Sequence, residues 1–208
     1  MKDARRILVG KCPGPRGERG TATLELAIVL PLLLVILFTI VDIGRLLDAR
    51  MTVAKLAQHG ALLGSRDLPV AVIPTANPVE LITLLQNASS LDLVNSGKIY
   101  FWQINGATSS ATAPVIATAN SGNTAGYGAL TVNSSIGTGT GYTKLGLTDA
   151  LYTALSWDSS LGMAPLAQIT VVEVFYRYQL ITPLVRFVRG FPVDSGGGYI
   201  VSSKALIP

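Results

Sequence analysis

Glu25 is an acidic residue at the upstream end of a strongly apolar stretch, and its chemistry is the first feature to explain. The next sixteen residues, 26–41, carry no charge. A carboxylate at the centre of a bilayer costs about 2.5 to 3.5 kcal/mol on insertion scales, so acids inside membranes usually serve a function. Two interpretations are open: Glu25 lies at the headgroup boundary and reaches water or Arg19, or it pairs with a cation from another chain.

Side chains that could do other chemistry are sparse. His59 is the only histidine and Cys12 the only cysteine, so we cannot assemble a Ser-His-Asp triad or a cysteine-based metal site. The acids after residue 66 are scattered singly, and the "DSGGGY" of 194–199 does not precede a helix as a phosphate loop would. We therefore expect no enzyme activity, no metal site, no cofactor and no small-molecule substrate, and we expect His59 on a helix surface.

Positive charge is concentrated at the N-terminus. Six basic and two acidic residues lie within 1–20, which accounts for the whole net charge of +4, because the remainder is neutral. A nucleic-acid-binding domain needs a basic face on its folded part. We therefore expect no nucleic-acid partner, and we interpret the basic leader as a signal for membrane orientation.

The apolar stretch has the length of a membrane helix. From Thr21 to Val41 it would extend roughly 31 Å at about 1.5 Å per residue, close to the ~30 Å hydrocarbon core of a bilayer. Lys and Arg gather upstream of it, so the positive-inside rule places the N-terminus in the cytoplasm and the residues after about 43 outside. The following "DIGRLLDAR" offers no secretory cleavage site, so the helix is expected to stay in the protein.

Pro31 lies within this predicted membrane helix. It cannot donate a hydrogen bond to the carbonyl of Ala27, and its ring crowds that turn. Membrane helices tolerate proline with a kink. We therefore predict a kink at Pro31.

Gly20 and Glu25 have a spacing that suggests how the acid is used. Glu25 is the fifth residue after the glycine, behind a basic leader and before an apolar run, which resembles the signal of type IV prepilins. The resemblance implies that a membrane aspartyl peptidase cuts between Gly20 and Thr21 on the cytoplasmic side. The new ammonium at Thr21 and the Glu25 carboxylate of neighbouring subunits could then neutralise each other in lipid.

A longer resemblance covers residues 16–66 and 168–184. The opening "RGERGTATLELAIVLPLLLVILFTIVDIGR" is similar to that of TadE-like proteins, the minor pilin-like (pseudopilin) components of tight-adherence pili. The segments "AKLAQHGALLGSR" and "QITVVEVFYRYQLITPL" are looser matches. The main departure is Leu26, where pilins of such systems often have Tyr. The matching positions of the opening are Glu25, Leu30-Pro31-Leu32, Asp42, Gly44 and Arg45.

The helix is expected to continue beyond the membrane, as one element from about 21 to 64. One of its faces carries an apolar stripe, which we expect to pack on the outer domain or else to form a dimer seam. The stripe consists of Ile43, Leu47, Met51, Ala54, Ala57 and Ala61.

Downstream patterns predict a small mixed domain. Asn77 and Pro78 start a short helix to about Gln86, and "LTDALYTALS" indicates another. Three segments read as strands: 97–106, a central strand 168–180 and a final strand 199–205 next to it. The "WDSS" of 157–160 reads as a turn. The large aromatic residues are expected in the core or at an interface, namely Trp102, Tyr152, Tyr176 and Tyr178.

The predicted fold is α+β: a long N-terminal transmembrane helix that continues into an amphipathic half and packs on a small antiparallel sheet, broadly pilin-like. We divide the chain into four segments. They are a basic cytoplasmic leader (1–20), a transmembrane helix (21–43), an amphipathic continuation (44–66) and an extracytoplasmic α+β domain (67–208). That domain contains a Ser/Thr/Gly-rich loop at 107–141, which has room for one edge strand.

The resemblance implies a minor pilin or pseudopilin that takes part in assembling a tight-adherence (Flp-type) pilus for surface adhesion. Its implied partners are the membrane, a prepilin peptidase, other pilin-like subunits and the assembly platform. It implies a single-pass protein of the bacterial inner membrane with a periplasmic C-terminal domain, in the filament or at its tip. The alternatives are an uncleaved membrane-anchored scaffold or binding protein, and a membrane-bound enzyme.

Overall fold

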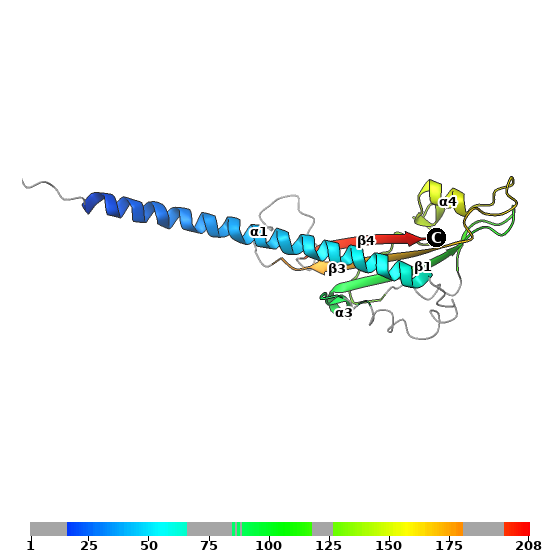
Figure 1. Ribbon diagram of the computed structural model, residues 1–208, viewed down its shortest axis with the longest axis horizontal. Coiled ribbons are helices and arrows are strands. Elements are labelled where there is room, and N and C mark those ends of the chain that lie inside the picture. The colour runs from blue at the N-terminus through cyan, green and yellow to red at the C-terminus, as the bar shows by residue number, and fades with distance from the viewer. Residues whose placement is uncertain (1–15, 66–84, 86, 88, 118–126, 181–197) are drawn as a thin grey trace, which may run out of the picture.

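The computed structural model describes four stretches and two single residues of the chain (Figure 1). The side chains of 16–21 and 64 lie outside the description. The described residues are 16–65, 85, 87, 89–117, 127–180 and 198–208.

One helix, α1 (Arg16–Ser65), contains 50 residues and forms the long axis of the molecule (Figure 1). Leucine, alanine and isoleucine dominate it, and Pro31 is its only proline. Thr39 satisfies its hydroxyl locally, donating to the Val35 carbonyl oxygen at 2.8 Å. The predicted helix over 21–64 is confirmed, and it begins earlier than predicted, within the basic leader.

Four strands form one antiparallel sheet in the order β2-β1-β3-β4. The central strand predicted at 168–180 is β3, which lies between β1 and β4. The edge strand expected within the 107–141 loop is β2, which pairs with β1. The predicted α+β class and the strand assignments are therefore confirmed. The strands are β1 (Gly97–Asn105), β2 (Val115–Ile116), β3 (Gln168–Tyr178) and β4 (Tyr199–Ile207).

The described residues include three complete short helical elements besides α1. The first is α3 (Leu93–Ser96), where Asp92 accepts a hydrogen bond from the Asn95 backbone nitrogen as a cap. The others are η2 (Lys144–Gly146) and α4 (Asp149–Leu155), which is the helix predicted from "LTDALYTALS". The helix predicted from Asn77 lies outside the described residues, except that Leu85 and Asn87 are helical.

Strands β1 and β3 are covered on both faces, whereas β4 is partly exposed. On one face, which we call the helix face, α1 packs against alternate residues of β1, β3 and β4, including Phe101, Val172 and Val201. On the other, the loop face, Trp102 and Val171 pack against η2, α4 and the segment between β2 and η2. The predicted alternation along β3 is thus confirmed, and the 127–166 segment forms a third layer.

The predicted packing stripe on α1 is largely wrong. Ile43, Leu47 and Met51 are exposed, and only Ala57 and Ala61 of that stripe are buried. The residues that contact the sheet are instead Ala49, Val53, Leu56, Ala57 and Ala61, which recur at helical spacing. Both faces of this part of α1 are apolar, so periodicity alone could not decide which face is buried.

Candidate functional site

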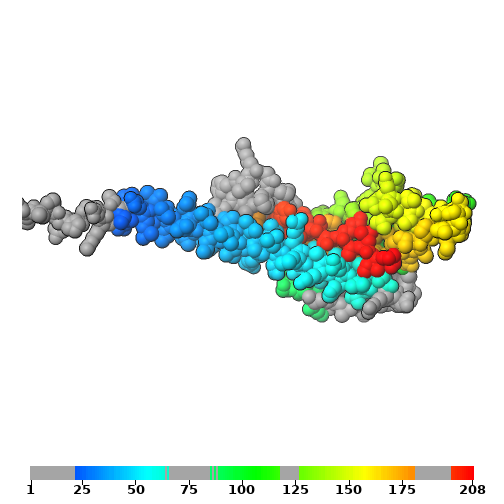
Figure 2. Space-filling model, turned by 45° about the horizontal axis from the view of Figure 1, so that its top comes forward, coloured from blue at the N-terminus to red at the C-terminus, as the bar shows by residue number. Residues whose placement is uncertain are grey.

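The first half of α1 projects beyond the sheet (Figure 2), and its large apolar side chains are exposed. Leu26 is 61% exposed, Leu33 57% and Ile40 65%. Within the described residues, one helix, α1, is both long enough and apolar enough to cross a membrane. The core helix of a soluble protein would bury such side chains, whereas these are exposed.

Gly20, Thr21 and Glu25 all lie within α1. Glu25 is exposed, and among the described residues no ion pair is made to its carboxylate. Glu25 is the fifth residue after Gly20, which places it about 7.5 Å further along the helix axis. The roles of Gly20 and Thr21 as a cleavage junction and of Glu25 as an assembly acid remain predictions.

Pro31 is contained within α1, which continues through it as a single helix. Its loss of one backbone hydrogen bond therefore does not end the helix, as expected for a proline in lipid. The kink predicted there remains a prediction.

The helix meets the sheet directly after the apolar run. Asp42 is 2% exposed, and Tyr178 at the end of β3 is 7% exposed. Burial raises the pKa of Tyr178 most, the Arg45 charge lowers it, and the Asp42 charge raises it. These charges therefore lie near the Tyr178 ring. Burial of α1 against the sheet domain thus begins at Asp42, directly after Val41, the last residue of the uncharged run.

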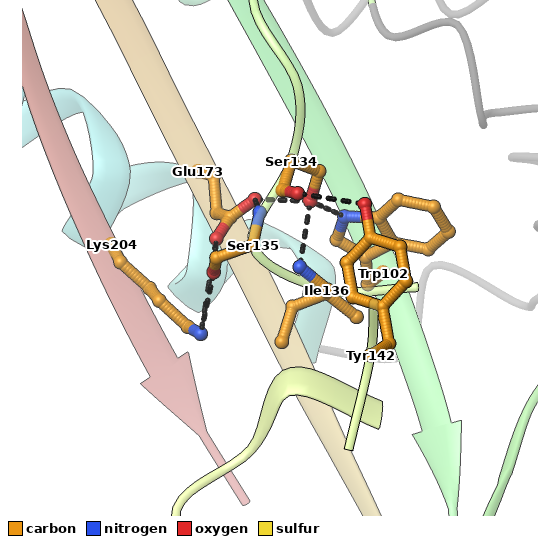
Figure 3. Close-up of polar contacts among 7 residues, drawn as sticks. All are labelled: Trp102, Ser134, Ser135, Ile136, Tyr142, Glu173 and Lys204. Carbon is orange, nitrogen blue, oxygen red and sulfur yellow. Dashed lines mark hydrogen bonds and ion pairs between the residues drawn. The ribbon is translucent and has the colours of Figure 1, made fainter. Parts of the chain in front are cut away.

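A buried carboxylate on the loop face organises the most extensive polar cluster among the described residues (Figure 3). Glu173, on β3, is 2% exposed. It accepts hydrogen bonds from the hydroxyls of Ser134 and Ser135 and from the Ser135 backbone nitrogen at 3.1 Å. Lys204 on β4 donates to the Ser135 hydroxyl at 3.0 Å, and its ammonium lies 3.8 Å from Glu173 Oε1.

Aromatic residues extend this cluster into the core. Trp102 Nε1 donates to Ser134 Oγ at 2.8 Å, and Tyr142 Oη donates to the Ser134 carbonyl oxygen at 3.0 Å. Tyr100 stacks on Trp102 with ring centroids 6.2 Å apart. Burial chiefly raises the pKa of Tyr100, and the negative charge of Glu173 raises it further.

The geometry of the Glu173 cluster favours a structural role. The carboxylate receives three donors and a nearby ammonium, so its oxygens are occupied from within the chain. A buried charge satisfied in this way stabilises one arrangement of the segments it joins. Glu173 therefore fastens the 134–136 segment to β3.

Sequence reasoning missed this cluster, because Glu173 was counted among the scattered acids. The available signal was its position in β3, between Val171 and Phe175 on an otherwise apolar face. An acid at such a position must find donors, because an unpaired buried charge is costly. Its partners, Ser134 and Ser135, came from a loop that showed no periodicity.

The other segments singled out from the sequence lie outside the Glu173 cluster. His59 is exposed on α1, as predicted, and the "WDSS" turn is confirmed, because Asp158 accepts hydrogen bonds from the nitrogen and hydroxyl of Ser160. Across the described ranges, no group of three His, Cys, Asp or Glu side chains is placed to hold a metal ion. Residues 194–197 of the "DSGGGY" segment lie outside the described residues.

Comparison with known families identifies the class of the N-terminal segment. Residues 20–62 match the family model of TadE, described as TadE-like protein. This match confirms the resemblance drawn from the residues of the opening, for that segment alone. No curated protein and no solved structure matches the chain.

Proposed function

We propose that this chain is a pilin-like component of a tight-adherence pilus, anchored in the bacterial inner membrane by α1 with its sheet domain in the periplasm. A prepilin peptidase removes residues 1–20, and Glu25 then guides the processed helix into the assembly. The protein acts through contacts with other pilin-like subunits and the assembly platform, rather than as an enzyme. Its assembly serves adhesion to surfaces.

The observation that carries the proposal is the match of residues 20–62 to TadE-like proteins, on a helix whose first half is exposed and apolar. The matched segment begins at Gly20 and includes Glu25. Supporting it, Glu25 is exposed on the apolar half of α1.

The test is the N-terminal residue of the protein purified from its native membranes. Intact mass and terminal peptide sequencing should find Thr21 first. Gly20→Leu should keep the full chain and abolish pili. Gly17→Leu is the matched control, because it changes another leader glycine by the same volume and should be processed normally. An uncut wild-type chain in cells that make the peptidase would contradict the proposal.

Glu25 can be tested separately from cleavage. Glu25→Gln removes the charge and keeps the shape, so the chain should still be processed but should assemble poorly. Asp48→Asn is the control, since Asp48 is an exposed acid of the same helix beyond the apolar run. Equal pilus counts for Glu25→Gln and the wild type would show that the acid has no role in assembly.

An uncleaved membrane-anchored scaffold is the second candidate, and one observation favours it. Helix α1 begins at Arg16, so the Gly20–Thr21 bond lies within a helix. Proteases bind extended chains, and cutting there requires this first turn and a half to unwind. If Met1 remains attached in native cells, the scaffold function replaces the pilin function.

A further inference from the structure

Two glycines of α1 have opposite surroundings. A Cβ built on Gly60 would lie 3.2 Å from Val172 Cγ1 and 3.4 Å from Phe101 Cζ, so Gly60 lets the helix approach the sheet closely. A Cβ built on Gly44 would have nothing within 4 Å among the described residues. A glycine inside a helix costs about 0.5 to 1 kcal/mol relative to alanine. Packing within the chain explains Gly60 and does not explain Gly44.

Gly44 lies in the middle of an exposed apolar line along α1, on the side away from the sheet. We call this line the outer seam. Its members recur at alternating intervals of four and three residues, the spacing by which one helix packs along another. Their exposures are 57% for Leu33, 55% for Leu37, 65% for Ile40, 52% for Leu47 and 58% for Met51.

Lipid does not account for the outer half of the seam. Leu47 and Met51 lie about 9 and 15 Å beyond Val41 at about 1.5 Å per residue, outside the hydrocarbon core. The charged residues Asp48 and Arg50 flank them. Leu47 and Met51 continue the exposed apolar line of the membrane half, and a contiguous exposed apolar surface marks an interaction site.

We propose that the outer seam binds the outer seam of a second copy of this chain, with Gly44 of one helix against Gly44 of the other. Small residues let two helices approach closely at their crossing point. Close approach needs a small residue on both helices, and a second copy supplies one at the same height. In a two-fold pair each seam residue meets its own counterpart.

The membrane fixes the direction of this pair. Both copies insert with the same orientation, so their α1 helices run parallel and the two-fold axis is normal to the bilayer. The sheet domains then face outward, because each α1 buries its opposite side in its own sheet. The inference rests on the proposed anchoring of α1, but it does not require Gly20 processing or pilus formation.

Disulfide cross-linking of the full chain in liposomes tests the pairing. In a Cys12→Ser background, Leu47→Cys puts a thiol on the seam and Asp48→Cys puts one on its flank, and both positions are exposed. We expect Leu47→Cys to form covalent dimers at least tenfold faster. Equal rates at the two positions, or cross-links to other pilus proteins in native membranes in place of dimers, would overturn the proposal.

Gly44→Leu tests the crossing point. Energy transfer between donor- and acceptor-labelled copies should show at least tenfold weaker association, with a smaller loss for Gly44→Ala. The variant should fold, because its side chain enters open space, and His59→Leu should associate like the wild type. Unchanged association of Gly44→Leu would overturn the proposal. If the wild type is monomeric but still needs Gly20 cleavage to make pili, the pairing alone is refuted. If the wild type pairs tightly but makes no pili, the proposed function alone is refuted.

Discussion

Glu173 on β3 and Lys204 on β4 are direct partners in the antiparallel register, and both side chains lie on the face of the sheet away from α1. Ser135 connects them, because its hydroxyl donates to the carboxylate and accepts from the ammonium. The loop that carries Ser134 and Ser135 is thus held against two strands by one buried charge.

We expect Glu173→Ala to lower the free energy of unfolding by about 2 to 3 kcal/mol, because it leaves the buried Ser134 hydroxyl and the two Ser135 donors without an acceptor. Denaturant unfolding of the full chain in mild detergent would measure the change, with Trp102 as the fluorescent reporter beside the cluster. Asp149→Ala is the control: Lys144 and Asp149 form an exposed pair at 2.7 Å, worth at most about 1 kcal/mol. Equal effects of the two substitutions would show that Glu173 is not a fastening point.

Two buried tyrosines should respond with opposite signs to the same substitution. Tyr100 Oη donates to the Val132 carbonyl oxygen at 2.6 Å, so Tyr100→Phe should destabilise the domain by about 1 to 2 kcal/mol. Tyr178 Oη is buried and has no hydrogen-bond partner among the described residues. Tyr178→Phe removes this unsatisfied group and should stabilise by about 1 kcal/mol. Unfolding curves of the two variants, measured under the same conditions, check both predictions. Destabilisation by Tyr178→Phe would show that Tyr178 Oη does make a hydrogen bond.

Leucine in place of Gly60 or Gly44 of α1 should separate the effect of packing from that of helix propensity. Gly60→Leu forces a side chain against Val172 and Phe101, and we expect a loss of about 3 kcal/mol, at the upper end for overpacked cores. Gly44→Leu meets open space and should stabilise the monomer by about 0.5 to 1 kcal/mol. Thermal unfolding in detergent at high dilution measures both, and similar losses would contradict the placement of α1 on the sheet.

The domain should lose stability at strongly alkaline pH. Burial raises the pKa of Tyr100, Tyr127, Tyr176 and Tyr178 above the ordinary value of 10.0. The unfolded chain therefore loses these protons first as pH rises. The stabilising contribution is complete below about pH 10 and is lost as pH rises through the folded pKa values.

Unfolding midpoints between pH 8 and 12 would check this dependence. Tyr100→Phe should reduce the slope above pH 10, because one of the shifted protons is removed. The Glu173 and Tyr142 charges face Tyr100, so Glu173→Gln should reduce the slope as well. A flat profile to pH 12 would contradict the burial of these hydroxyls.

The sequence predicted those parts of the fold whose signals are local and strong. The uncharged run to Val41 predicted the helix, and the alternation along 168–180 predicted the central strand and its two faces, because a strand places successive side chains on opposite sides. The position of Glu25 within the exposed half of α1 followed from the same run. Its role, like that of Gly20, depends on other molecules and is not decided by one chain.

The rest depended on contacts between distant segments. The buried side of α1 could not be chosen, since Leu47 and Val53 are equally apolar and only the sheet distinguishes them. The donors to Glu173 come from residues 38 and 39 positions away, in a loop without periodicity. Long-range pairing of this kind leaves no local pattern.

The direction of α1 relative to the strands has a mechanical consequence. Asp42 and Arg45 lie near Tyr178, where β3 ends, and Gly60 lies against Val172 nearer its start. The helix therefore runs lengthwise along the sheet, so a pull on the anchor loads their contact in shear. All the side chains between Ala49 and Ala61 must slide together before the helix can leave. The domain and its anchor should thus withstand traction as one body, whereas a helix crossing the strands would peel away one turn at a time.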